Sequence, residues 1–202
     1  MNVNDNSVNI KDDRASYHHG DLRSALVAEG LRLLAAHDAG RLSLREIARN
    51  VGVSATAVYR HFPDKNALLS ALAFEGGEQL AEQQMVAQQA AGEGVAGFDA
   101  TGRVYVRFAL ANPALFRLMM VNARDGAVID GQTDRAKGLS LLRRNIAALA
   151  TPGTSAQVQR VQAVQSWAIV HGLAMLILDG QVPPDDALID AVVSTAGIDG
   201  KD

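Results

Sequence analysis

The spacing of apolar positions follows a helical period along most of the chain. Leu44, Ile47, Ala48 and Val51 recur at the i, i+3, i+4, i+7 spacing of a single helical face. Beyond residue 65 the helical pattern continues, with breaks at residues 92–97, 112–113, 122–131, 150–155 and 180–184. Residues 121–129 favour an irregular loop over a small hairpin. The pattern predicts an all-α fold.

Two short helices are predicted between residues 43 and 62. Ser43, followed three residues later by Glu46, fits a capping box that begins a helix, and Gly52 permits the backbone geometry that ends it. Ser54 offers a second N-cap after a break of two residues. Because the break is so short, the second helix must leave at a steep angle, which predicts a helix-turn-helix.

The second of these helices is predicted to expose a hydrogen-bonding face. On a helical wheel Val58 points toward the core with Phe62, whereas Thr56 and Arg60 point away. A helix about 10–12 Å wide fits the major groove of B-DNA, and an arginine can bind guanine through two hydrogen bonds. We therefore expect Thr56 and Arg60 to meet base edges. An ordinary solvated helical hairpin is the alternative, and it is less consistent with the combined cap, turn and core pattern.

Residues 21–72 strongly resemble the DNA-binding domain of the tetracycline-repressor (TetR) family of transcription regulators. The motif positions that carry the resemblance are Ser43, Glu46, Ile47, Ala48, Gly52, Val53, Ser54, Tyr59, His61, Phe62, Lys65 and Leu68. The resemblance implies that Tyr59, His61 and Lys65 hold phosphates and that Arg45 reaches the groove or the backbone. The residues expected to meet DNA are Arg45, Ala55, Thr56, Ala57, Tyr59, Arg60, His61 and Lys65.

Two positions depart from the family pattern. Ala57 stands where the family often has a threonine that contacts the DNA backbone, so we expect one hydrogen bond fewer. Thr56 stands where glycine or proline is frequent, so the operator sequence does not transfer from relatives.

An additional helix is predicted upstream of the pair. Leu22, Leu26, Leu33 and Leu34 form an apolar face that can pack across both short helices and complete a three-helix domain. His18 and His19 are followed closely by Asp21, but no further ligand pair accompanies them, which argues against a metal site. We expect residues 1–16 to form a disordered arm, and we expect Arg14, Tyr17 and the two imidazoles to touch DNA. The expected domains are residues 17–64 for DNA binding and 65–202 for the helical body.

Charge is distributed unevenly between these expected domains. The 202-residue chain has 19 basic and 22 acidic side chains, yet residues 41–65 hold five basic and two acidic ones. A positive segment on an acidic body favours specific DNA binding over general adhesion to nucleic acid.

Composition also limits location and chemistry. The chain has no cysteine, which excludes disulfides and cysteine metal clusters. The N-terminus has no apolar signal segment, and the apolar stretch from Trp167 to Leu178 is shorter than the roughly 20 residues that span a bilayer. We therefore expect a cytoplasmic protein without membrane contact.

The body is expected to hold a ligand and to dimerise. A connecting helix over about residues 65–89 should couple the body to the DNA-binding domain. The aromatic and methionine side chains of the body can either line an adaptable pocket or form plain core. The segment Trp167–Gly172 resembles a C-terminal class of the family marked by Trp, His and Gly, and the family resemblance implies a ligand pocket and a homodimer through the last two helices. The candidate ligand-binding residues are Tyr105, Phe108, Phe116, Met119, Met120, Trp167, His171 and Met175.

No pattern in the sequence supports catalysis. Gly92, Gly94 and Gly97 fit the spelling G-x-G-x-x-G, but they follow a helical stretch where a dinucleotide motif needs a strand. We therefore expect no enzyme activity, no cofactor and no metal. The hypothesis is a dimeric repressor that binds a near-palindromic operator and is released by a small-molecule effector. The alternative is a small-molecule sensor or carrier whose helix-turn-helix contacts protein.

Overall fold

A computed structural model describes residues 19–122 and 137–194, and over this part of the chain every regular element is a helix. The N-terminal elements are α1 (His19–Ala36), the short 3-10 helix η1 (Ala39–Arg41), α2 (Leu44–Val51) and α3 (Ala55–His61). The remaining elements are α4 (Lys65–Ala91), α5 (Val95–Ala111), α6 (Pro113–Asn122), α7 (Lys137–Leu149), α8 (Ala156–Leu178) and α9 (Asp186–Val193). The predicted all-α fold is confirmed.

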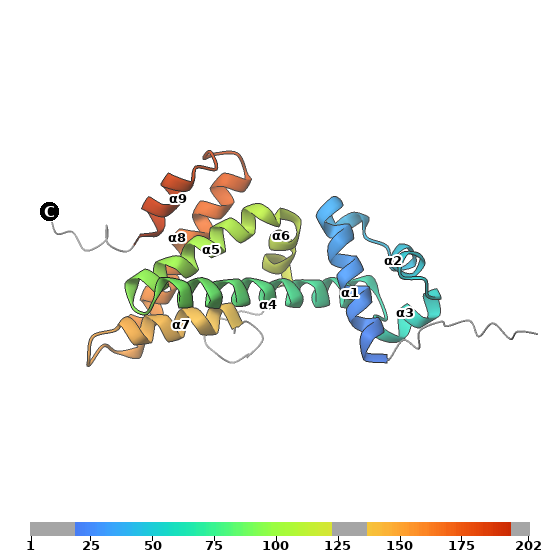
Figure 1. The fold of residues 1–202 in the computed structure, drawn as a ribbon, viewed down its shortest axis with the longest axis horizontal. Helices are drawn as coiled ribbons and strands as arrows, with labels where there is room; N and C mark the ends of the chain where they lie inside the picture. Colours follow the sequence, from blue (N-terminus) through green and yellow to red (C-terminus); the bar gives the residue numbers. More distant parts are fainter. Residues whose placement is uncertain (1–18, 123–136, 195–202) are drawn as a thin grey trace, which may run out of the picture.

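The three N-terminal helices gather at one end of an elongated molecule (Figure 1). Leu26 and Leu34 of α1 pack with Ile47 of α2 and Val58 of α3, and all four side chains are almost fully buried. A surface hydrogen bond also links α2 to α1, because the Asn50 amide donates to Glu29 Oε1 at 2.7 Å.

The long helix α4 runs from this end into the body (Figure 1). Its buried positions Leu68, Leu72, Gly76, Leu80 and Gln84 recur every four residues, so the buried stripe winds gradually around the helix between its two ends. α5 and α6 pack along α4, α7 packs against α4 and α8, and α9 covers α5 and α8. The glycines at positions 76 and 77 do not interrupt the helix.

Four helices begin at side-chain caps, among them the cap predicted at Ser54. The side chains of Ser54, Asp64, Ser155 and Asp185 each accept a backbone N–H in the first turn of the helix that follows. Pro113 begins α6, where its missing N–H costs nothing.

The capping box predicted at Ser43 is wrong in its side-chain detail. Ser43 is the N-cap of α2, but its side chain makes no capping hydrogen bond. The Glu46 carboxylate lies 4.0 Å from the Arg49 guanidinium, and no hydrogen bond is recorded between Glu46 and the Ser43 amide in the described part of the chain. The helix still begins at Leu44, and the backbone N–H of Ile47 donates to the Ser43 carbonyl at 3.1 Å.

The glycine motif at residues 92–97 forms the turn between α4 and α5. Gly92 and Gly94 have φ values of 90° and 78°, which residues with a Cβ rarely adopt. Gly97 lies in the first turn of α5, where an added Cβ would run into the Gly92 carbonyl oxygen. The three glycines therefore serve a tight helix-to-helix connection.

Helix α8 corrects the expectation about membrane-spanning length. It has 23 residues, and its most apolar 18-residue window has a mean hydropathy of 1.6, so its length and composition alone would suffice to cross a bilayer. Only 22% of its most apolar window is buried. The helix nevertheless packs against α5, α7 and α9, and part of its apolar surface faces outward.

Substitution of two glycines tests the packing of this turn. Gly97→Ala should lower the free energy of unfolding by about 1–3 kcal/mol, because the methyl group meets backbone that cannot move away cheaply. Gly77→Ala is the matched control, since a Cβ there meets nothing within 4 Å, and it should raise stability by about 0.5–1 kcal/mol. Urea unfolding followed by circular dichroism measures both. Wild-type stability in Gly97→Ala would contradict the packing described.

Candidate functional site

The turn between α2 and α3 fixes the direction of α3. Gly52 ends α2 in the left-handed conformation, with φ 79°, and its N–H donates to the carbonyls of Ala48 and Arg49. Ser54 then accepts the Ala57 N–H at 3.2 Å and begins α3. Val58 and Phe62 are buried, so α3 is held by one side only.

The opposite side of α3 is exposed and polar. Thr56, Tyr59 and Arg60 are all exposed, and Arg45 of the preceding helix is exposed as well. Among the residues that the structure describes, Arg45 and Arg60 have no hydrogen-bond or ion-pair partner. Their guanidinium groups are therefore available to an anionic partner.

The other predicted DNA contacts are less exposed. Ala55, Ala57 and His61 are half-buried, and Lys65 is half-buried at the start of α4. The Lys65 ammonium donates a 2.6 Å hydrogen bond to the Gly40 carbonyl, which ties α4 to the segment before α2. Sequence reasoning missed this bond, because no local pattern relates positions 25 residues apart.

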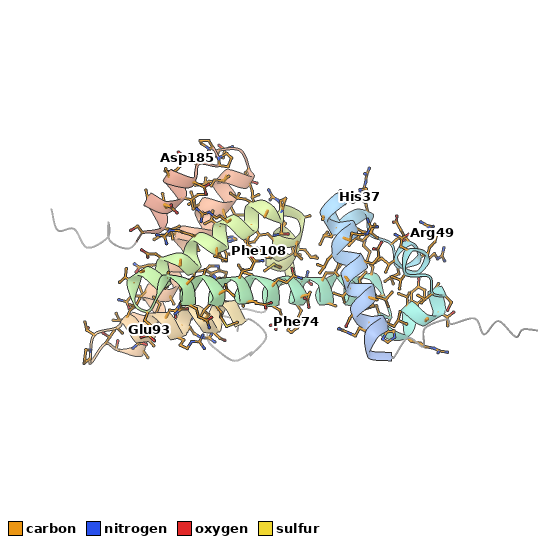
Figure 2. All side chains as sticks on the ribbon, viewed as in Figure 1. His37, Arg49, Phe74, Glu93, Phe108 and Asp185 are labelled. Carbon is orange, nitrogen blue, oxygen red and sulfur yellow. The ribbon has the colours of Figure 1, made fainter. Side chains whose placement is uncertain are left out.

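One side chain joins α1 to the end of α3. The Arg23 guanidinium lies 5.3 Å from the centre of the Phe62 ring, within reach of a cation–π attraction. Phe62 is the C-cap of α3, and its N–H donates to the Val58 carbonyl. In Figure 2, Arg49 marks the outer side of α2 at this end of the molecule.

A cavity of about 630 Å³ lies between α4, α5, α6, α7 and α8, and residues of α1 and α9 complete its lining. This volume is within the range that holds a small molecule. Four predicted ligand-binding residues line it: Tyr105, Met119, Met120 and Trp167. Leu80, Leu141 and Leu142 add apolar surface.

The other four predicted ligand-binding residues lie outside the cavity lining that the structure describes. Phe116 is fully buried, and its ring contacts Tyr105 edge-on with 5.5 Å between ring centres. His171 stacks beside Phe116 at 5.8 Å. Phe108 is buried in the core between α4 and α5, as Figure 2 illustrates, and Met175 packs against the same core. These residues form a layer behind the cavity wall.

Sequence reasoning missed the polar part of the lining. Gln84 and Asp99 both line the cavity and are 8% and 6% exposed. A signal for Gln84 was present, because it extends the buried four-residue repeat of α4 by one step. A polar residue at a core position of an otherwise regular stripe is typical of a functional site.

Two polar side chains of the cavity wall are connected to a third that lies behind it. The Trp167 indole N–H donates to the Tyr105 hydroxyl at 3.0 Å, and that hydroxyl lies 3.1 Å from His171 Nδ1. The chain is complete when Tyr105 donates its own proton to Nδ1 of a neutral His171 that carries its hydrogen on Nε2.

Burial keeps both titratable members of this chain uncharged near neutral pH. Burial raises the pKa of Tyr105 to about 12, and the hydrogen bond from Trp167 opposes that rise only in part. Burial lowers the pKa of His171 below its ordinary value of 6.5. The arrangement is suited to holding a rigid aromatic wall, with the imidazole neutral.

The amino-acid sequence of the protein matches two known family models. Residues 26–72 match the family described as "Bacterial regulatory proteins, tetR family", and residues 98–196 match "Tetracyclin repressor-like, C-terminal domain". Uncharacterised HTH-type transcriptional regulators from two strains of Mycobacterium tuberculosis are 32% identical over 149 residues. That alignment covers 68% of this chain and 62% of each relative, so the chain spans less than two thirds of their length.

Solved structures share the fold. A protein of unknown function from Rhodococcus sp. RHA1 superposes with a TM-score of 0.71 at 32% identity, covering 92% of this chain and 96% of its own. A tetR-family transcriptional regulator from Streptomyces coelicolor gives a TM-score of 0.63 at 21% identity, covering 86% of this chain and 78% of its own. At the lower identity the likeness concerns the fold alone.

Acidification tests the environment of His171. Because its pKa is lower in the folded protein than in the unfolded chain, the unfolded chain takes up the proton first as the pH falls. Stability should therefore be complete above the ordinary histidine pKa and decline as the pH drops through it. Urea unfolding at about pH 7.5 and about pH 5.5 should show a smaller acid loss in His171→Gln than in the wild type. The exposed His37 provides the control His37→Gln, which should behave as the wild type. An equal acid loss in all three proteins would contradict the assignment.

Proposed function

This chain belongs to the tetracycline-repressor family of transcriptional regulators, and on that basis we propose that it is a repressor whose homodimer binds a near-palindromic DNA operator. In this proposal a small molecule that enters the body cavity releases the DNA. The observation that carries the proposal is α3, which is anchored through Val58 and Phe62 and leaves Thr56 and Arg60 exposed.

The exposed face of α3 suits the major groove. Arg60 has the reach and geometry to bind a guanine edge through two hydrogen bonds, and Thr56 can contact a neighbouring base. Five further residues surround this pair and would touch the DNA backbone or the groove wall. They are the exposed Tyr59 and Arg45 and the half-buried Ala55, Ala57 and His61. Lys65 would contribute a phosphate contact through the N–H groups that its bond to Gly40 leaves over.

An exposed apolar stripe on α8 supports the homodimer. Val158, Val161, Ile169 and Leu176 lie on one side of the helix, and each is more than a third exposed. Gly172 lies in the same stripe, and a Cβ built there would meet nothing within 4 Å. A second copy of the chain would cover this surface, together with the neighbouring helix α9. A two-fold pair of this kind would place the recognition helices about 34–36 Å apart.

Helix α6 offers a route from the cavity to the DNA-binding domain. Met119 and Met120 line the cavity, and α6 also packs against α1 and α4. Gly76 lets α6 approach α4 closely, since a Cβ there would lie 2.9 Å from both Leu115 and Met119. An effector that prefers one position of α6 would bias the arrangement of the two DNA-binding domains only by its difference in affinity for the two states.

The proposal includes location and the absence of catalysis. A DNA-binding repressor acts in the cytoplasm, and the stripe on α8 would then be covered by a second copy and not by lipid. Among the described residues no group of three or more His, Cys, Asp or Glu side chains could hold a metal ion. A sensor or carrier whose helix-turn-helix contacts protein is the alternative, and it would leave DNA unbound at every salt concentration.

Replacing Arg60 tests the contact with bases. Operator fragments are first selected from a random DNA pool with the wild-type protein. Arg60→Ala should weaken binding to them by about 1–3 kcal/mol and relax the preference at one base position, because one bidentate contact is lost. Fluorescence anisotropy at several salt concentrations measures both effects.

Lys65→Ala is the contrast variant. It should weaken selected and random DNA about equally and flatten the salt dependence, because a phosphate contact carries no base information. Unchanged operator preference in Arg60→Ala would contradict its assignment to base edges. Selection that enriches no DNA would favour the alternative function.

A charge placed in the α8 stripe tests the dimer. Leu176→Glu should shift the protein from dimer to monomer and weaken operator binding, because a buried interface would have to desolvate two unpaired carboxylates. Val86→Glu is the control, since Val86 is 62% exposed on α4, away from the stripe, and it should leave the dimer intact. Analytical ultracentrifugation measures both proteins. A stable Leu176→Glu dimer would contradict the assignment of this surface.

A further inference from the structure

The cavity contains a buried acceptor that lacks a hydrogen bond. Gln84 is 8% exposed and lines the cavity, and within residues 19–122 and 137–194 its Oε1 is the buried side-chain atom that has no partner. Buried polar atoms are normally satisfied, because leaving one unpaired costs free energy. This atom therefore points to a group that the protein itself does not supply.

The orientation of the Gln84 amide is fixed by its other end. Its Nε2 donates a 3.0 Å hydrogen bond to the Thr101 backbone carbonyl on α5. A carbonyl can only accept, so the NH₂ group must face Thr101 and the oxygen must face away from it. Rotating the amide by a half turn would place two oxygens together and lose this bond.

A glycine on α7 leaves space beside the oxygen. A Cβ built at Gly138 would lie 3.4 Å from Gln84 Oε1, and Gly138 lines the same cavity. Any larger residue at this position would cover the acceptor. The helix thus passes close to the acceptor and places no side chain against it at this position.

The hydroxyl and indole donors in the described cavity lining are already used. The Thr101 hydroxyl donates to the Phe98 carbonyl, and the Ser166 hydroxyl donates to the Gln162 carbonyl. The Trp167 N–H donates to Tyr105, as described above. At the opposite end of the cavity, Ser70 donates to Asn122, whose own amide donates to Leu118. The lining therefore offers a buried acceptor and has few donors to spare.

Charge in the lining disfavours an anion near Gln84. Asp99 is buried in the same lining and already has an interaction partner of its own, so it adds no positive group that an anion could bind. The cation in the described lining is Arg23, whose guanidinium lies over Phe62. Phe62 precedes α4, whereas Gln84 lies roughly five turns into that helix.

We propose that the effector is a neutral, mainly apolar molecule that donates a hydrogen bond from a hydroxyl or N–H group to Gln84 Oε1. The apolar body packs against the leucines, methionines and aromatic rings of the lining. Gln84 is then the specificity-determining residue of the cavity. This inference rests on the proposed function, in which the cavity receives the effector.

Two isomeric probes separate the donor from the apolar body. n-Decanol and methyl n-nonyl ether have the same atoms and nearly the same shape, but only the alcohol can donate a hydrogen bond. n-Decanoate adds the anionic case. Trp167 is the single tryptophan of the chain and lines the cavity, so its fluorescence reports binding of each probe.

The wild-type protein should bind n-decanol roughly 3- to 10-fold more tightly than the ether, because only the alcohol satisfies the buried oxygen. n-Decanoate should bind more weakly than either. Gln84→Leu should abolish the preference for the alcohol but still bind the ether. Gly138→Ala should also reduce the preference for the alcohol, since the added methyl group would cover the acceptor.

Gln88→Leu is the matched control. Gln88 lies one turn further along α4 and exchanges two hydrogen bonds with Asn145, at 3.0 and 3.2 Å, outside the described cavity lining. Its replacement also removes a partly buried amide, but the preference for n-decanol over the ether should stay as in the wild type. Thermal unfolding of every variant checks that the fold is intact.

Each outcome bears on a separate claim. Equal binding of alcohol and ether by the wild type, or the same preference in Gln84→Leu, overturns the role of Gln84 even if the probes release DNA. Tighter binding of n-decanoate overturns the neutral class. Failure of every probe to bind overturns the cavity as an effector site, and with it this inference. Probes that bind as expected but never release the selected operator leave Gln84 as the anchor and overturn the effector-controlled repressor.

Discussion

The continuous packing along helix α4 is the constraint on which the rest of the structure depends. Leu68 and Leu72 pack with the N-terminal helices, and Leu80 packs with the body, so one hydrophobic core runs through both parts. A Cβ at Gly30 of α1 would lie 2.9 Å from Leu72, which shows how closely the N-terminal part is fitted to α4. Packing this dense tolerates few intermediate positions, so a displaced α4 must carry its neighbours with it.

Much of the fold could be predicted because helix starts are local chemistry. Ser54, Asp64, Ser155 and Asp185 cap the helices that follow them, and each cap depends on residues at most three positions away. Ser43 shows the limit of this reasoning, because the capping-box spelling is present and the helix begins where expected, yet the Ser43 side chain makes no capping hydrogen bond. The bond from Lys65 to Gly40 was beyond sequence analysis, since it depends on the angle between α4 and the segment before α2.

The site was predicted unevenly for a related physical reason. A helical wheel separates the two sides of α3, so the exposure of Thr56 and Arg60 could be anticipated. Cavity walls are different, because an aromatic residue looks the same in sequence whether it lines a cavity or lies one layer behind it. Tyr105 and Phe116 illustrate this, as both are buried in contact with each other and only Tyr105 reaches the cavity. Contact with DNA and with a ligand at these residues stays a prediction.

The Lys65–Gly40 bond has a mechanical consequence. It ties the first turn of α4 to the segment ahead of α2, and so links this end of the helix to the DNA-facing helices. The 27 residues of α4 make a lever about 40 Å long. A tilt of only about 5° at the body end would swing the other end by about 3.5 Å, close to the rise of one base pair along a DNA strand. A small rearrangement in the body would therefore displace the DNA-binding end of α4 by about one base-pair step, which is enough to change the alignment of two recognition helices with their half-sites.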